Sequence, residues 1–77
     1  MKWQDRITIK PDVCHGKACI KDTRVMVSMI LANLSEGETY ESIMSNFHVM
    51  REDIEASIAF GADMAEDRFL PLSEEAA

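Results

Sequence analysis

The spacing of apolar residues changes once along the chain, near residue 28, and this change constrains the fold more than any other feature. Before it, short β-prone stretches alternate with turn residues, as in Arg6-Ile7-Thr8-Ile9. After it, apolar residues recur at helical spacing to about residue 67. The sequence therefore predicts a mainly α fold in a single domain. An extended β arm over residues 1–27 precedes a three-helix core over residues 28–68 and a flexible acidic tail over residues 69–77.

The arm is expected to contain short strands separated by turns. Residues 6–9 and 18–20 are the two clearest strand candidates, and residues 25–27 form a third β-prone stretch. Gly16 and the polar run 21–24 mark turns between them, with a positive φ expected at the glycine. Because an isolated hairpin is barely stable in water, the strands must pair within the chain or with a second chain.

Start and stop signals divide the helical region into three helices. Ser28 and Thr39 are the expected N-caps of the first two helices, and Gly37 ends the first. His48 marks the break before the third helix, which opens with carboxylates in its first turn, where the helix dipole favours them. The first two helices are expected to bury Val27, Ile30, Leu31, Leu34, Tyr40, Ile43, Met44 and Phe47.

The third helix carries two apolar stripes. The stripe expected to face the first two helices consists of Ile54, Ile58, Gly61 and Ala65. The other stripe consists of Ala56, Phe60 and Met64. We expect a second chain to cover Phe60 and Met64, since exposed apolar stripes mark contact surfaces. Such a homodimer would also use Ile7 and Ile9 of the arm. The alternative is that the arm of the same chain covers this stripe.

Charge is distributed unevenly along the chain. Residues 1–24 carry six basic and three acidic side chains, whereas residues 25–77 carry two basic and eleven acidic ones. The net charge of −6 argues against a general nucleic-acid binder, and the asymmetry favours self-association or a basic partner. Any contact with DNA should therefore come from the arm, through Arg6, Lys10, Lys17, Lys21 and Arg24.

Residues 40–59 can be laid on the helix-turn-helix template. Four of its apolar positions are filled by Ile43, Phe47, Val49 and Ile54. The residue types at three other positions depart from it, namely Met44, His48 and Ser57. The second helix of the template corresponds to the third helix of this chain. Its exposed face would present Glu52 and Glu55, whose carboxylates repel phosphates. A helix-turn-helix shape used for packing is therefore favoured over one that reads the major groove.

The candidates for metal binding or nucleophilic catalysis are Cys14, His15, Cys19 and His48. Their spacing is not the paired Cys-x2-Cys of structural zinc sites. Cys14 and His15 are adjacent, so in an extended segment they point to opposite faces. We expect no metal, no cofactor and no enzymatic activity. The chain begins without an apolar signal segment, so a cytoplasmic location with reduced thiols is expected.

A longer pattern is carried by Ile7-Thr8-Ile9 and by residues 13–27, Val-Cys-His-Gly-Lys-Ala-Cys-Ile-Lys-Asp-Thr-Arg-Val-Met-Val. With Gly37-Glu38-Thr39, Ile43 and Arg51-Glu52-Asp53-Ile54, it resembles the small bacterial family called domain of unknown function 433, over about residues 6–66. The family-motif residues are Gly16, Ile20, Thr23 and Arg24. Ala18 stands where the family usually has proline and Asp22 where it usually has glycine, although aspartate tolerates left-handed turns.

The resemblance implies a homeodomain-like helical core preceded by short strands. It also implies a function as the antitoxin partner of a PIN-like ribonuclease toxin encoded beside it, whose basic RNA-binding surface the acidic body could cover. A small DNA-binding regulator and a structural homodimer are the alternatives. For Arg24, one role is an ion pair with Asp22 or Asp53 that pins the arm to the helices, and the other is contact with a partner or DNA.

Overall fold

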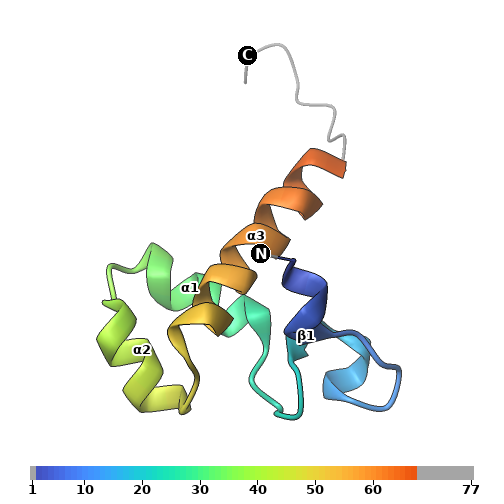
Figure 1. Cartoon of the computed structure of the whole chain (residues 1–77), viewed down its shortest axis with the longest axis horizontal. Helices are drawn as coiled ribbons and strands as arrows, with labels where there is room; N and C mark the ends of the chain where they lie inside the picture. The colour runs from blue at the N-terminus through green and yellow to red at the C-terminus, as the bar shows by residue number, and fades with distance from the viewer. Residues whose placement is uncertain (1, 68–77) are drawn as a thin grey trace.

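Three helices follow a pair of short strands, which confirms the predicted fold class (Figure 1). The structure is a computed structural model that describes residues 2–67, so the predicted acidic tail over residues 69–77 lies outside the described residues. In order, the elements are the 3-10 helix η1 (Trp3–Asp5), strand β1 (Ile7–Thr8), the 3-10 helix η2 (Cys14–Gly16), strand β2 (Cys19–Ile20) and helices α1 (Val27–Ser35), α2 (Tyr40–Phe47) and α3 (Arg51–Asp67). No helix among residues 2–67 is long and apolar enough to cross a membrane.

The two strands pair with each other within the chain. β1 and β2 are antiparallel, with Ile7 opposite Ile20 and Thr8 opposite Cys19. The third β-prone stretch contributes a single bridge, from Met26 to Cys19, before the chain enters α1. The arm is therefore a small two-stranded element closed by one further bridge, and it does not depend on a second chain for pairing.

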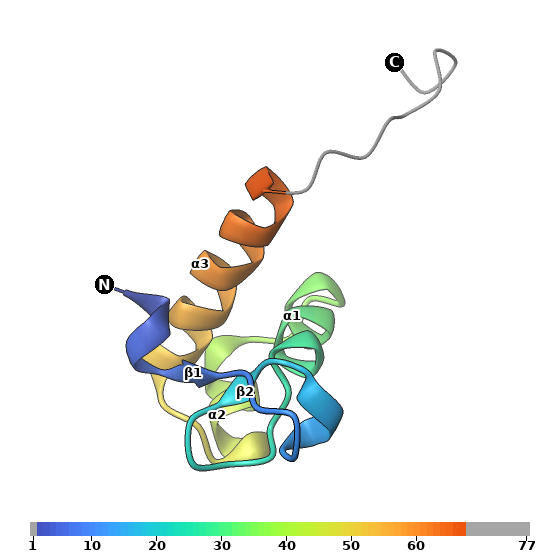
Figure 2. The ribbon, with the colours of Figure 1, turned by 90° about the vertical axis from the view of Figure 1, so that its right-hand side faces the viewer.

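The arm and the helices share one hydrophobic core. Ile7 and Ile20 from the strands pack with apolar side chains of all three helices. Figures 1 and 2 show η1 and α1 on different sides of α3, while β2 lies against α1. Ile7 is only 4% exposed, so it is a core residue of its own chain, and the expected dimer contact there is corrected. Ile9, two residues on, is 53% exposed.

Two of the predicted helix signals are confirmed and one is wrong. Thr39 caps α2, because its Oγ1 accepts the backbone N–H of Ser42 at 3.0 Å. Gly37 follows α1 with a φ of +91°, as expected of a helix-ending glycine. Ser28 is not an N-cap, since α1 begins at Val27 and its N-cap residue makes no side-chain cap. The start of α1 is set instead by the arm, because the N–H of Val27 donates to the carbonyl of Ala18 at 3.0 Å.

The first apolar stripe of α3 is only half buried. Ile54 is fully buried and Gly61 packs against α1, where an added Cβ would lie 3.3 Å from Leu31 Cδ1. Ile58 is 42% exposed and Ala65 is exposed, so the expectation that both face the other helices is wrong. Ala65 lies near the C-terminal end of α3, which extends beyond the other helices in Figure 1.

The second stripe of α3 is covered by the arm of the same chain. Phe60 packs edge-to-face against Trp3 of η1, with ring centroids 4.9 Å apart, and Ala56 is fully buried. Trp3 Nε1 also donates to the carboxylate of Asp63 at 2.6 Å. This is the alternative arrangement considered above, so the expected contact of Phe60 with a second chain is corrected. It arises because η1 folds the start of the chain back onto α3. Met64 stays half-buried beside Phe60.

The two predicted N-caps make a matched pair for a stability measurement. We expect Thr39→Ala to lower the free energy of unfolding by about 1 kcal/mol, because the N–H of Ser42 loses its acceptor. Ser28→Ala should change it by less than about 0.5 kcal/mol, because an exposed residue without a capping bond is replaced. Urea denaturation followed by circular dichroism measures both values. An equal loss in the two variants would contradict the assignment of the caps.

Candidate functional site

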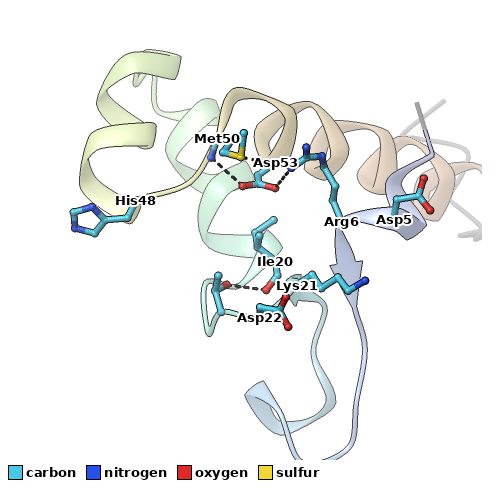
Figure 3. A pocket seen from close by; sticks show the side chains of 9 residues that line it. Asp5, Arg6, Ile20, Lys21, Asp22, His48, Met50 and Asp53 are labelled. Atoms are coloured by element: carbon cyan, nitrogen blue, oxygen red, sulfur yellow. Dashed lines mark hydrogen bonds and ion pairs between the residues drawn. The ribbon is translucent and has the colours of Figure 1, made fainter.

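The carboxylate of Asp53 joins the arm to α3 (Figure 3). Its Oδ1 accepts from Arg6 Nη1 at 2.9 Å, and its Oδ2 accepts from the backbone N–H of Met50 at 2.9 Å. Met50 directly precedes α3, so the second bond satisfies an N–H that the start of a helix leaves free. Asp53 is 7% exposed, and both of its oxygens are used.

The ion pair that pins the arm to the helices is therefore made by Arg6 and not by Arg24. Among residues 2–67, the Arg24 side chain has no carboxylate within 4.0 Å, so the expected pairing with Asp22 or Asp53 is corrected. The strand pairing explains why Arg6, and not Arg24, pairs with Asp53. The carbonyl of Arg6 accepts the N–H of Lys21 at 2.8 Å, which fixes Arg6 at the end of β1 that lies against α3.

Ser57 is buried directly behind this pair. Its Oγ donates to the carbonyl of Asp53 at 2.9 Å, and the residue is fully buried. The sequence places a serine here, where the helix-turn-helix template has an apolar residue. The hydrogen bond to Asp53 satisfies the hydroxyl, which is why a polar side chain is tolerated at this position.

A hollow of about 600 Å³ opens beside the Arg6–Asp53 pair. Figure 3 shows Arg6 and Asp53 pointing toward each other at its edge, while the His48 ring points away. The hollow is lined by Asp5, Arg6, Ile20, Lys21, Asp22, Thr23, His48, Met50 and Asp53. Three carboxylates and two cations line it, so side chains of both charges face the hollow.

A second hollow, of about 310 Å³, lies on the other side of the turn formed by residues 21–24. It is lined by Thr8, Lys10, Val13, Lys21, Asp22, Thr23 and Arg24. Three of the five basic residues predicted to contact nucleic acid therefore share one site. We call it the basic hollow, after Lys10, Lys21 and Arg24.

The turn that carries two of these cations is held by Thr23. Its Oγ1 donates to the carbonyl of Ile20 at 2.7 Å and accepts the N–H of Val25 at 3.0 Å. Asp22 has a φ of +62°, a left-handed conformation that aspartate tolerates better than most residues. The motif threonine thus has a positioning role, and it fixes the backbone on both sides of Lys21 and Arg24.

The comparisons with known proteins agree with the motif. The family model for proteins of unknown function called DUF433 matches residues 7–61. The chain belongs to the DUF433 family. A DUF433 member protein from Anabaena variabilis ATCC 29413, solved by crystallography at 2.00 Å resolution, is 30% identical and superposes with a TM-score of 0.75. The match covers 82% of this chain and 63% of that chain, so this chain spans less than two thirds of the relative. No curated protein matches the sequence.

The other motif and candidate residues of this DUF433 protein lie apart from the basic hollow. Gly16 ends η2 with a φ of +80°, which confirms the predicted left-handed turn, and Ile20 is in the core. Arg6 is engaged by Asp53, which corrects its assignment as a free nucleic-acid contact. Lys17 lines a third hollow, of about 490 Å³, together with Phe60 and Met64.

The two thiols of the DUF433 chain lie against the same turn. Cys14 Sγ donates to the carbonyl of Arg24 and Cys19 Sγ to that of Thr23, both at 3.6 Å. Partial burial and the neighbouring Cys19 thiol raise the pKa of Cys14, and Arg24 acts in the opposite direction. Across residues 2–67, no group of three or more histidine, cysteine or acidic side chains could hold a metal ion.

Removing the Asp53 carboxylate should destabilise the whole domain. We expect Asp53→Ala to lower the free energy of unfolding by about 2 kcal/mol, about half of it from the lost cap of α3 and half from the partly exposed ion pair. Glu52→Ala is the matched control, because it removes a neighbouring exposed carboxylate in the same helical turn. Urea denaturation of both variants measures the difference, and equal values would show that neither the cap of α3 nor the Arg6–Asp53 contact contributes to stability.

The raised pKa of Cys14 predicts slow alkylation. A thiol whose pKa is raised above its ordinary value of 9.0 is almost wholly protonated at neutral pH, and the protonated thiol is a poor nucleophile. We expect iodoacetamide to modify Cys14 more slowly than free cysteine at neutral pH, with the difference narrowing at alkaline pH as both thiols ionise. Mass spectrometry of Cys14→Ser and Cys19→Ser variants assigns the label. Reaction of Cys14 faster than free cysteine would contradict this.

Proposed function

We propose that this DUF433 protein is a non-enzymatic binding module, the antitoxin of a toxin–antitoxin pair, which neutralises a PIN-like ribonuclease. The observation that carries the proposal is the charge of the helices. Residues 27–67 contain nine acidic side chains and a single basic one, Arg51. A nuclease of this type binds RNA through a basic surface, and a protein surface dense in carboxylates can occupy that surface in place of phosphates.

The carboxylates are free to act on a partner because they are exposed and largely without cations. The exposed acidic residues of the helical half are Glu36, Glu38, Glu41, Glu52, Glu55, Asp63 and Glu66. Within residues 2–67, a cation lies within 4.0 Å of only one of them, where Arg51 meets Glu41 at 3.7 Å on an exposed surface. Such an exposed ion pair has a small interaction free energy, so the surface keeps its negative charge.

The outward face of α3 combines these carboxylates with exposed apolar side chains. Glu55 and Ile58 are neighbours on the helix surface, and Met50 precedes the first turn with 54% of its surface exposed. Carboxylates repel a DNA backbone, whereas a mixed acidic and apolar face suits a basic protein surface. We therefore propose that the helix-turn-helix-like pair of α2 and α3 serves packing and protein binding, and does not read bases.

The assembly and location form part of the same proposal. Ile9 is exposed, and Met64 is half-buried beside the third hollow, so these two remain available to a second copy in a homodimer. A cytoplasmic location agrees with two free thiols, Cys14 and Cys19.

Co-purification followed by an inhibition assay tests the function. The tagged chain, expressed from its native locus, should bring down a PIN-like nuclease in stoichiometric amount and should suppress RNA cleavage by it. Glu52→Lys with Glu55→Lys should weaken this inhibition by about tenfold or more, because two contacts of the acidic face are reversed. Asp5→Lys with Asp12→Lys is the matched control, since the charge change is the same but lies on the arm.

Two results would reject the antitoxin function. One is the absence of any complex between the two purified proteins at micromolar concentration. The other is an equal loss of inhibition in the arm control and the α3 variant, which would show that net charge and not the acidic face determines the effect.

A further inference from the structure

We infer that the basic hollow binds a phosphate group of a nucleic-acid backbone. Lys10 reaches it from the segment after β1, and Lys21 and Arg24 from the turn after β2. This inference goes beyond the antitoxin proposal and does not depend on it, because it concerns the basic arm and not the acidic helices.

The three cations converge without a countercharge that neutralises them. Among residues 2–67, no carboxylate lies within 4.0 Å of Lys10, Lys21 or Arg24, and Asp22 is the single acidic residue that lines the hollow. Like charges gathered in one place repel each other, and a bound anion relieves this repulsion. The hollow therefore carries an excess of positive charge in a chain whose net charge is −6.

The backbone around the hollow is fixed before any ligand arrives. The two hydrogen bonds of Thr23 hold the turn, and Cys14 Sγ donates to the carbonyl of Arg24. The N–H of Ile20 donates to the carbonyl of Val25 at 2.8 Å and closes the turn at its base. Binding then orders only the ends of three side chains, which keeps its entropic cost low.

The lining of the hollow selects a phosphate and not a whole nucleotide. Its volume of about 310 Å³ is at the lower end of the range for small-molecule sites. Val13 is the single apolar side chain that lines the hollow, and no aromatic ring lines it, so a base has no surface on which to stack. Cations and the hydroxyl of Thr8 are groups that contact backbone phosphates without reading sequence. A phosphodiester of a polymer fits these properties.

The salt dependence of the affinity for duplex DNA is the measurement that tests this site. Each phosphate neutralised on duplex DNA contributes about −0.9 to the slope of log K against log of the salt concentration. One phosphate held jointly by Lys10, Lys21 and Arg24 predicts a contribution of about −0.9 to the slope, and hence about a 3.5-fold loss of affinity between about 50 and about 200 mM salt. Fluorescence anisotropy with a labelled DNA duplex of about two helical turns gives this slope.

Paired variants assign the slope to the hollow. Lys21→Gln with Arg24→Gln should remove most of this contribution of about −0.9, and Lys10→Gln, from a different segment, should reduce it as well. Lys2→Gln with Lys17→Gln removes the same charge from the arm outside the hollow and should leave the slope nearly unchanged. Circular dichroism checks that each variant is folded.

Competition identifies the ligand chemistry. Polyglutamate at the same charge concentration should displace the duplex poorly, and inorganic phosphate should displace it no better than chloride at equal ionic strength. Equal displacement by polyglutamate would assign the hollow to an acidic protein, and strong displacement by phosphate to a small free anion, and either result would overturn the inference. So would an equal loss of slope in the Lys2 and Lys17 control, or no binding at about 100 µM protein in low salt.

Discussion

The two bonds accepted by Asp53 hold the two halves of the molecule together. One carboxylate oxygen binds Arg6 at the start of the arm's first strand, and the other caps α3. Because Arg6 also shares a backbone bond with Lys21, the same contact sets the position of the turn that carries the motif residues. The burial of Ile7, the packing of Trp3 on Phe60 and the shape of both hollows beside the turn follow from this placement.

The sequence predicts the elements well where the signals are local. The helical period, the cap at Thr39 and the glycine at residue 37 each depend on residues within one turn, and each is found in the structure. The cap at Ser28 and the partner of the Phe60 stripe depend on contacts between the arm and the helices. An N-cap pattern does not include the bond from Val27 to Ala18, and an apolar stripe does not reveal that η1 brings Trp3 onto it.

The candidate site is predictable only in part for a similar reason. The sequence identifies the basic residues of the arm, but nothing in their spacing separates Arg6, which is paired with Asp53, from Lys10, Lys21 and Arg24, which share a hollow. An ion pair that spans 47 residues leaves no periodic pattern. The acidic residue at the third position of α3 is the one local signal, since a carboxylate there commonly reaches back to the helix start.

The Arg6–Asp53 pair also lies where the two charged parts of the protein meet. It neutralises one charge of each sign at the boundary, so the acidic face of α3 and the basic hollow keep opposite potentials within one small domain. Electrostatic potential extends over about 10 Å at ordinary ionic strength. A basic protein bound to the helices would therefore weaken the repulsion between this acidic chain and a phosphate at the hollow. The two proposed surfaces would then strengthen each other's binding without any change in the fold, because each ligand reduces the charge that opposes the other.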